Sequence, residues 1–223
     1  MIKENVQQLF RELPDGVELV AAAKSRSIAQ IEQAVAAGVK IIGENYVQEA
    51  EQAFASLGAR VKWHFIGHLQ RNKVKKAVKI FDMIETVDSL KLAEAIERIS
   101  HEAQKVMPVL IEINSGKEAQ KFGVLPQDAP GLVRKISCLR HIRVMGLMTM
   151  GPQFGSPELA RPYFQLTRRT WEKIRDEHIE NVEMKYLSMG MSNSYQLAIE
   201  EGANLIRIGG KIFTHNAEKT TCN

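Results

Sequence analysis

The sequence predicts a (β/α)8 barrel, an α/β fold in which one parallel sheet closes on itself inside a ring of helices. Short apolar runs alternate with longer amphipathic stretches along the chain, and eight such runs fit into 223 residues. This alternation is typical of a parallel sheet covered by helices, and eight units in about 200–250 residues favour a closed barrel. An open doubly wound sheet is disfavoured because no G-x-G-x-x-G motif follows the first run. We therefore expect one domain over residues 1–223.

The predicted strands are short runs rich in valine, isoleucine, leucine and methionine. In chain order they cover residues 17–23, 39–42, 61–66, 83–87, 106–113, 142–148, 184–187 and 205–208. Helical spacing of apolar side chains marks residues 27–37, 88–99 and 158–178, with Asp88 as a candidate N-cap for the second. Residues 193–201 are predicted to form a helix capped by Ser192. Because the segment before the first strand is short, we expect a reduced first helix.

Composition and charge narrow the class of protein. An apolar content of 44% and a charged content of 25% are ordinary for a globular protein with a real core. The net charge of +4 permits anionic ligands without demanding nucleic acid. Cys138 and Cys222 show no metal-ligand spacing, which predicts no metal site and favours a reducing compartment. With no signal-peptide core and no run near the ~20 apolar residues that span a bilayer, we expect a cytoplasmic protein without membrane contact.

A run of cations over residues 71–79 offers nucleic-acid binding as an alternative function. On a helix, however, these side chains spread around the surface, and a solvated face is the simpler interpretation. The run contains no aromatic residues on which bases could stack. We therefore expect no nucleic-acid partner.

Lys24 ends the first predicted strand, in the segment E-L-V-A-A-A-K-S over residues 18–25. Alternation along a strand places Val20, Ala22 and Lys24 on one face. The small side chains leave room for a bulky group against the amine, and a partly desolvated amine is a usable nucleophile for a carbonyl. The alternative is a lysine that merely ends a strand and points into water. Barrel sites lie at the carboxyl ends of the strands, so the other strand ends bear on this choice.

A candidate phosphate site follows the seventh and eighth strands. Barrels often hold a phosphate between these two loops and the amino end of a helix. Here the loops are S-M-G-M-S over residues 188–192 and I-G-G-K over residues 208–211. Their glycines let backbone N–H groups approach an anion, and Ser192 adds a hydroxyl. An ordinary glycine-containing turn is the alternative.

Arg207 lies within the last predicted strand. Alternation directs Ile206 and Ile208 toward the helices and Arg207 into the barrel. An inward guanidinium is costly without a partner. Either it forms a structural ion pair with an inward acid, such as Glu85 or Glu112, or it donates a hydrogen bond to an aromatic ring nitrogen of a ligand.

A lysine after strand one, a phosphate loop after strands seven and eight and an inward arginine resemble a pyridoxal 5′-phosphate barrel of the alanine racemase type. More closely, the sequence resembles the pyridoxal phosphate homeostasis protein family. The matching segments run in order and cover nearly the whole chain: V-A-A-A-K-S (20–25), G-E-N-Y-V-Q-E (43–49), W-H-F-I-G-H-L-Q-R-N-K (63–73), G-L-M-T-M (146–150), L-S-M-G-M-S (187–192) and I-R-I-G-G (206–210). The third of these is highly specific.

The resemblance implies a single barrel that carries pyridoxal 5′-phosphate as a Schiff base on Lys24. It implies that Arg207 faces the pyridine nitrogen. The other cofactor-binding positions that it implies are Ser192, Gly209 and Gly210 for the phosphate, with Asn45 and His64 at matching motif positions nearby.

The sequence departs from the family at three places. Ser194 stands where an acid is common, and Gly210 stands where a hydroxyl residue often follows R-I-G. The Gly210 departure removes one hydroxyl contact to the phosphate and leaves the backbone N–H. Residues 213–219 also differ from the usual ending.

The family is associated with vitamin B6 and amino-acid homeostasis, without an established reaction. Alanine racemases add a β-rich domain that supplies a second catalytic base, and we expect this chain to lack it. No second base is evident, and an arginine at the ring nitrogen would leave that nitrogen unprotonated. We therefore expect a monomeric carrier or regulator of the cofactor, with apo-enzymes as possible acceptors. A weak amino-acid racemase is the alternative.

Overall fold

The computed structural model describes residues 1–116, 118, 122–151 and 156–214. Its strands follow one another in chain order around a closed parallel barrel, in which the first strand also pairs with the last. The strands are β1 (Glu18–Ala22), β2 (Ile41–Glu44), β3 (Lys62–Phe65), β4 (Met83–Val87), β5 (Met107–Ile113), β6 (Ile142–Thr149), β7 (Val182–Ser188) and β8 (Leu205–Ile208). The predicted (β/α)8 barrel is confirmed.

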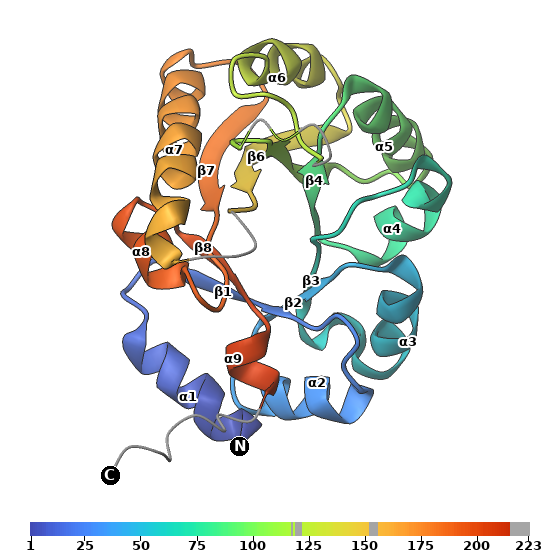
Figure 1. Ribbon diagram of the computed structural model, residues 1–223. Helices are drawn as coiled ribbons and strands as arrows, with labels where there is room; N and C mark the ends of the chain where they lie inside the picture. Colours follow the sequence, from blue (N-terminus) through green and yellow to red (C-terminus); the bar gives the residue numbers. More distant parts are fainter. Residues whose placement is uncertain (117, 119–121, 152–155, 215–223) are drawn as a thin grey trace.

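Helices surround this barrel on all sides (Figure 1). They are α1 (Ile2–Glu12), α2 (Ile28–Ala36), α3 (Val47–Leu57), α4 (Val74–Ile80), α5 (Leu90–Glu102), α6 (Ala129–Ser137), α7 (Arg161–Asp176), α8 (Tyr195–Glu200) and α9 (Gly210–Phe213). Short 3-10 turns cover Gly58–Arg60, Arg71–Lys73 and Pro157–Ala160. None of the described helices is both long and apolar enough to cross a membrane.

The expectation of a reduced first helix is wrong. α1 has 11 residues, and its Ile2, Val6 and Leu9 are buried. These side chains recur at helical spacing, so one face of the helix packs against the barrel although the segment is short. α1 also lies beside α9, where the Asn5 side chain donates a hydrogen bond to the Ile212 carbonyl at 3.0 Å.

Two predicted helix starts are also wrong. The N-cap of α8 is Ser194 rather than Ser192, because the chain makes a turn first in which the Ser194 N–H donates to the Met191 carbonyl. The N-cap of α5 is Ser89, one residue after Asp88. The predicted start of α2 is confirmed, since the Ser27 hydroxyl accepts the Gln30 N–H at 3.3 Å.

The core has two layers. A large apolar layer lies between the sheet and the helices. A smaller cluster fills the barrel interior and consists of Val20, Ile41, Met83, Leu110, Met148, Tyr186 and Leu205. Polar interior residues replace this cluster toward the carboxyl ends of the strands, where Glu85, Ser188 and Arg207 are buried. Apolar side chains therefore close the middle of the barrel, and a buried polar group lies toward the carboxyl ends of the strands.

Some sequence features lie outside the described residues. These are Cys222 and the part of the unusual ending after residue 214.

Candidate functional site

Lys24 lies just beyond the carboxyl end of β1, at the polar end of the barrel. In the sheet register Ala22 pairs with Gly43 of β2, and Gly43 pairs with His64 of β3. Lys24 and Asn45 each stand two residues beyond the Ala22–Gly43 pair. The structure therefore brings Lys24, Asn45 and His64 to neighbouring strands at one end of the barrel.

The Lys24 side chain is exposed. The prediction that protein side chains partly desolvate its amine is therefore wrong. The three residues directly before Lys24, 21–23, are alanines, whose small side chains leave the amine uncovered. Its Nζ lies 5.5 Å from the centre of the Tyr46 ring, a cation–π distance. The following residue, Ser25, has a φ of 59° and donates its N–H to Glu49 Oε2 at 2.8 Å. This contact fixes the turn that presents Lys24.

Ser192, Gly209 and Gly210 come together on the adjacent side of the same end. β8 pairs with β1, and a Cβ atom on Gly209 would lie 3.1 Å from the Ala22 carbonyl oxygen. A Cβ on Gly210 would lie 3.5 Å from the Ser192 hydroxyl, which accepts the Lys211 N–H at 3.4 Å. The two glycines therefore keep backbone close to β1 and leave the Ser192 hydroxyl accessible beside the start of α9.

Arg207 points into the barrel, as predicted, and is 3% exposed. Its NH1 donates to the Ser188 hydroxyl at 2.6 Å and its NH2 donates to the Thr149 carbonyl at 2.8 Å. The ion-pair alternative is present only as a long contact, with 3.9 Å between Arg207 NH1 and Glu85 Oε2. The Ser188 hydroxyl joins the two groups, because it donates to Glu85 Oε2 at 2.6 Å.

His64 completes this buried network from β3. Its Nδ1 lies 2.7 Å from Glu85 Oε1. Burial alone would raise the pKa of Glu85, but the His64 contact, the Arg207 charge and the Ser188 hydrogen bond together hold that pKa below its ordinary value. Because an ionised carboxylate only accepts hydrogen bonds, the His64 ring N–H is the donor. Burial lowers the pKa of Arg207, and the charges of Glu85 and Glu112 oppose that shift.

Glu112 is a second interior carboxyl group near Arg207. Burial, followed by the charge of Asp88, raises the pKa of Glu112 to about 7, although Arg207 acts in the opposite direction. Glu112 follows Leu110 of the interior apolar cluster by two residues and so points to the same side of β5. The polar end of the barrel thus holds one ionised carboxylate, Glu85, and one carboxyl that titrates near neutrality.

Glu44, the last residue of β2, is buried without full hydrogen bonding. It is 1% exposed, and its Oε2 atom has no hydrogen-bond partner within the described part of the chain. Burial, followed by the charge of Glu49, raises the pKa of Glu44 to about 8. The carboxyl is therefore protonated in the folded protein at a pH where it would be ionised in the unfolded chain.

This shift predicts that Glu44 weakens the fold as the pH rises. The folded state holds the Glu44 proton up to about pH 8, whereas an ordinary glutamate loses it near 4.5, so the unfolding free energy falls between these values. We expect the unfolding free energy of the wild type, relative to a Glu44→Gln variant, to drop across this range by an amount on the order of a few kcal/mol. Urea denaturation at several pH values measures it. A difference that does not change with pH would contradict the assignment.

Several residues of this site were not predicted as cofactor-binding positions. Tyr46 follows Asn45 in the segment G-E-N-Y-V-Q-E over residues 43–49. Its aromatic ring, so close to a predicted site residue, could have indicated a role beside Lys24. Ser188 ends a strand, but its link to Arg207 depends on the packing of β7 against β8. Glu85 was named only as a possible ion-pair partner, and its contact with His64 crosses from β4 to β3.

The barrel belongs to the class represented by the alanine racemase N-terminal domain, whose family model matches residues 1–217. An alanine racemase from Clostridium difficile has the same fold, with a TM-score of 0.83 over the whole of this chain and 58% of that one at 14% identity. Within this class, the chain belongs to the pyridoxal phosphate homeostasis protein family. A protein of that name from Aquifex aeolicus is 38% identical over 88% of this chain and 86% of its own length.

A solved relative adds a ligand to this comparison. PipY of Synechococcus elongatus, in a structure with pyridoxal phosphate bound, is 34% identical to this chain. The TM-score is 0.88, and the match covers 96% of this chain and all of that one.

Proposed function

We propose that this protein binds pyridoxal 5′-phosphate as a Schiff base on Lys24 and serves vitamin B6 and amino-acid homeostasis. The observation that carries the proposal is the similarity of the whole chain to PipY, a protein solved with pyridoxal phosphate bound. In this proposal the protein is a cytoplasmic monomer of one domain, and it passes the cofactor to apo-enzymes.

The geometry around Lys24 fits such a ligand. The exposed amine is free to meet an aldehyde, and the backbone N–H groups near Gly209 and Gly210 with the Ser192 hydroxyl suit a phosphate. Both groups lie at one end of the barrel because β1 and β8 are paired. In this arrangement Tyr46 flanks the amine, Asn45 directly follows β2, and His64 lies on the next strand, β3.

Arg207 has N–H donors that could bond to the pyridine nitrogen of the cofactor. A guanidinium carries five N–H donors, and the Ser188 hydroxyl, the Thr149 carbonyl and the Met150 sulfur each accept one of them. Ser188 and Glu85 contact this guanidinium, and His64 in turn contacts Glu85. Since arginine does not give up its proton, a ring nitrogen that accepts from Arg207 stays unprotonated. When bound, the pyridoxal ring supplies an electron sink for amino-acid chemistry, and an unprotonated ring is a weaker sink.

We therefore expect the protein to exchange cofactor rather than turn over amino acids. In deuterated buffer, the cofactor-loaded protein should leave the α-proton of added L-alanine in place over hours, as followed by proton NMR. The same preparation should restore activity to an apo form of a pyridoxal-phosphate enzyme. Rapid α-proton exchange that disappears in a Lys24→Ala variant would contradict the carrier role and favour the racemase alternative.

A further inference from the structure

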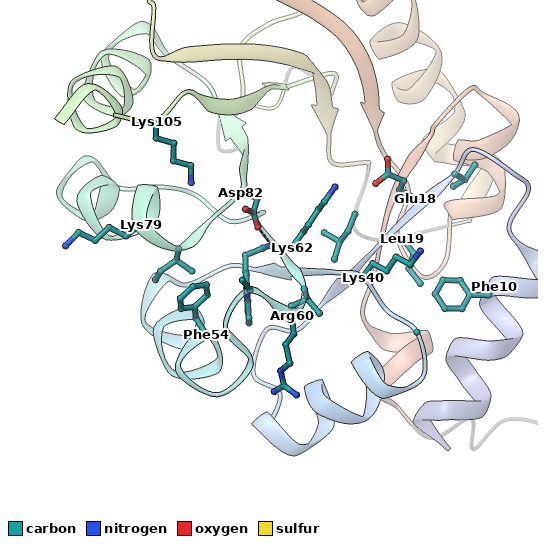
Figure 2. Close-up of a pocket in the computed structure, with 17 residues that line it drawn as sticks. Phe10, Glu18, Leu19, Lys40, Phe54, Arg60, Lys62, Lys79, Asp82 and Lys105 are labelled. Atoms are coloured by element: carbon teal, nitrogen blue, oxygen red, sulfur yellow. Dashed lines mark hydrogen bonds between the residues drawn. The ribbon is translucent and has the colours of Figure 1, made fainter. Parts of the chain in front are cut away.

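A large cavity lies at the end of the barrel opposite Lys24. Its volume is about 800 Å³, which is within the usual size of small-molecule sites. The lining comes mainly from residues that begin or precede the first strands, among them Glu18, Lys40, Lys62, Asp82 and Lys105. It also includes Phe10 of α1 and Phe54 of α3, so helices form its outer wall (Figure 2).

The cavity is separate from the proposed cofactor site. Ile41 pairs with Lys62 in the sheet register, and Ile41 belongs to the apolar cluster in the barrel interior. Lys62 therefore points to the same interior side, at the amino-terminal mouth of the barrel. The apolar cluster, including Val20 and Leu205, fills the interior between this mouth and Arg207. A molecule in the cavity would not contact Lys24.

Positive charge dominates the lining. Five cationic side chains, those of Lys40, Arg60, Lys62, Lys79 and Lys105, line the cavity with two carboxylates. Each carboxylate already accepts a hydrogen bond: Asp82 from the Trp63 N–H at 2.8 Å and Glu18 from the Tyr186 hydroxyl at 3.2 Å.

Two of the five cations have protein partners. Lys105 donates to the Val78 and Phe81 carbonyls, and Arg60 donates to the Leu57 and Ser56 carbonyls. Among the described residues, the side-chain ammonium groups of the other three, Lys40, Lys62 and Lys79, have no hydrogen-bond or ion-pair partner. Figure 2 shows Lys40 and Lys62 on neighbouring strand starts, with Phe10 beyond Lys40 and Lys79 extending outward from α4.

We propose that this cavity binds an organic anion of small-molecule size, which carries phosphate or carboxylate groups on an apolar body. Lys40 and Lys62 would hold the anionic groups, because ammonium groups without protein partners are available for charge-assisted hydrogen bonds. Phe10, which is 41% exposed, and the half-buried Phe54 would contact the apolar body. The volume is larger than a lone phosphate needs, which favours an organic anion over an inorganic one. This site goes beyond the proposed function and does not depend on it.

Calorimetric titration of the full chain with ATP as the probe tests the proposal. ATP should bind more tightly than adenosine or pyrophosphate alone, since each of these carries only one of the two recognised parts. A Lys40→Gln/Lys62→Gln variant should raise the dissociation constant by about tenfold. A Lys135→Gln/Lys173→Gln variant removes the same charge from exposed positions on α6 and α7, and it should bind as the wild type does.

The same titration separates this site from the cofactor site. Lys24→Ala should leave ATP binding unchanged, and so should one equivalent of pyridoxal 5′-phosphate fixed on Lys24 by borohydride. Loss of ATP binding in either protein would place ATP at the Lys24 end of the barrel and overturn the proposal. An unchanged affinity in the Lys40→Gln/Lys62→Gln variant would overturn it as well. Binding of a polyglutamate peptide in place of ATP would also overturn the proposal, because the cavity would then bind an acidic protein segment and not a small molecule.

Discussion

A Lys24→Ala variant is expected to lose the cofactor almost completely. Wild-type protein incubated with pyridoxal 5′-phosphate should remain yellow after gel filtration, with close to one cofactor per chain, whereas the variant should elute colourless. The physical reason is that the amine is the atom that bonds to the aldehyde. Without it, only noncovalent contacts remain, and a small ligand held by these alone leaves the protein during filtration.

The variant should keep its fold, because the Lys24 side chain is exposed and its Nζ donates no hydrogen bond within the described part of the chain. Circular dichroism and the thermal midpoint should match the wild type. Lys173→Ala, at another exposed lysine, is the matched control and should remain yellow. Lys24→Arg keeps the positive charge but cannot form the bond, and it should also elute colourless. Stable colour in Lys24→Ala would show that another group holds the cofactor.

A Glu85→Ala variant is expected to lose a large share of the fold's stability. Glu85 is fully buried and receives hydrogen bonds from His64 and Ser188, while Arg207 lies 3.9 Å away. Removal of the carboxylate takes away the larger of the two opposite charges that act on the buried guanidinium, and breaking such a buried pair costs about 3–5 kcal/mol. Urea denaturation of wild type and variant measures this difference in unfolding free energy.

Two controls separate this effect from a general loss of side-chain contacts. Glu51→Ala removes a glutamate from an exposed pair with Lys76, and it should cost about 0–1 kcal/mol. Ser188→Ala removes only the hydroxyl between Arg207 and Glu85, and it should cost about 1–3 kcal/mol. If Glu85→Ala costs no more than Glu51→Ala, the network does not support Arg207.

The same network has a pH dependence of known sign. The pKa of Glu85 lies below its ordinary value in the folded protein, so the folded state favours the ionised carboxylate. The stability that this contributes is present above the ordinary glutamate range and is lost as the pH falls through the lower folded value. Glu44 acts in the opposite direction, because its pKa is raised to about 8. A Glu85 variant should therefore change the pH dependence of the unfolding free energy below the ordinary glutamate range, and a Glu44 variant should change it between about pH 4.5 and pH 8.

The barrel could be predicted from sequence because its strands are apolar runs of the right number and spacing. The bounds of β4 (Met83–Val87) and β8 (Leu205–Ile208) agree with the prediction. β2 begins later than predicted, because the Val39 N–H still bonds to the Ala34 carbonyl at the end of α2. β7 begins earlier, since its first residues alternate between half-buried and exposed side chains and show no apolar run.

The candidate site could be predicted only in part. Alternation placed Arg207 inside the barrel, because side-chain direction follows from position along a strand. It could not decide between the possible partners, which depend on how β4, β6 and β7 pack around β8. Nor could it show that Lys24 is exposed, because exposure depends on the loops around it. The cavity near Lys40 and Lys62 was not predicted, since its walls come from segments far apart in the chain.

Borohydride reduction of the protein loaded with pyridoxal 5′-phosphate, followed by proteolysis and mass spectrometry, tests the central claim most directly. Reduction makes the bond between cofactor and lysine permanent, so the labelled peptide identifies the attachment site. We expect a single phosphopyridoxyl group on the peptide that contains Lys24. A label on another lysine, such as Lys211 beside Ser192, or no label on a protein that is visibly yellow, would contradict the assignment of Lys24.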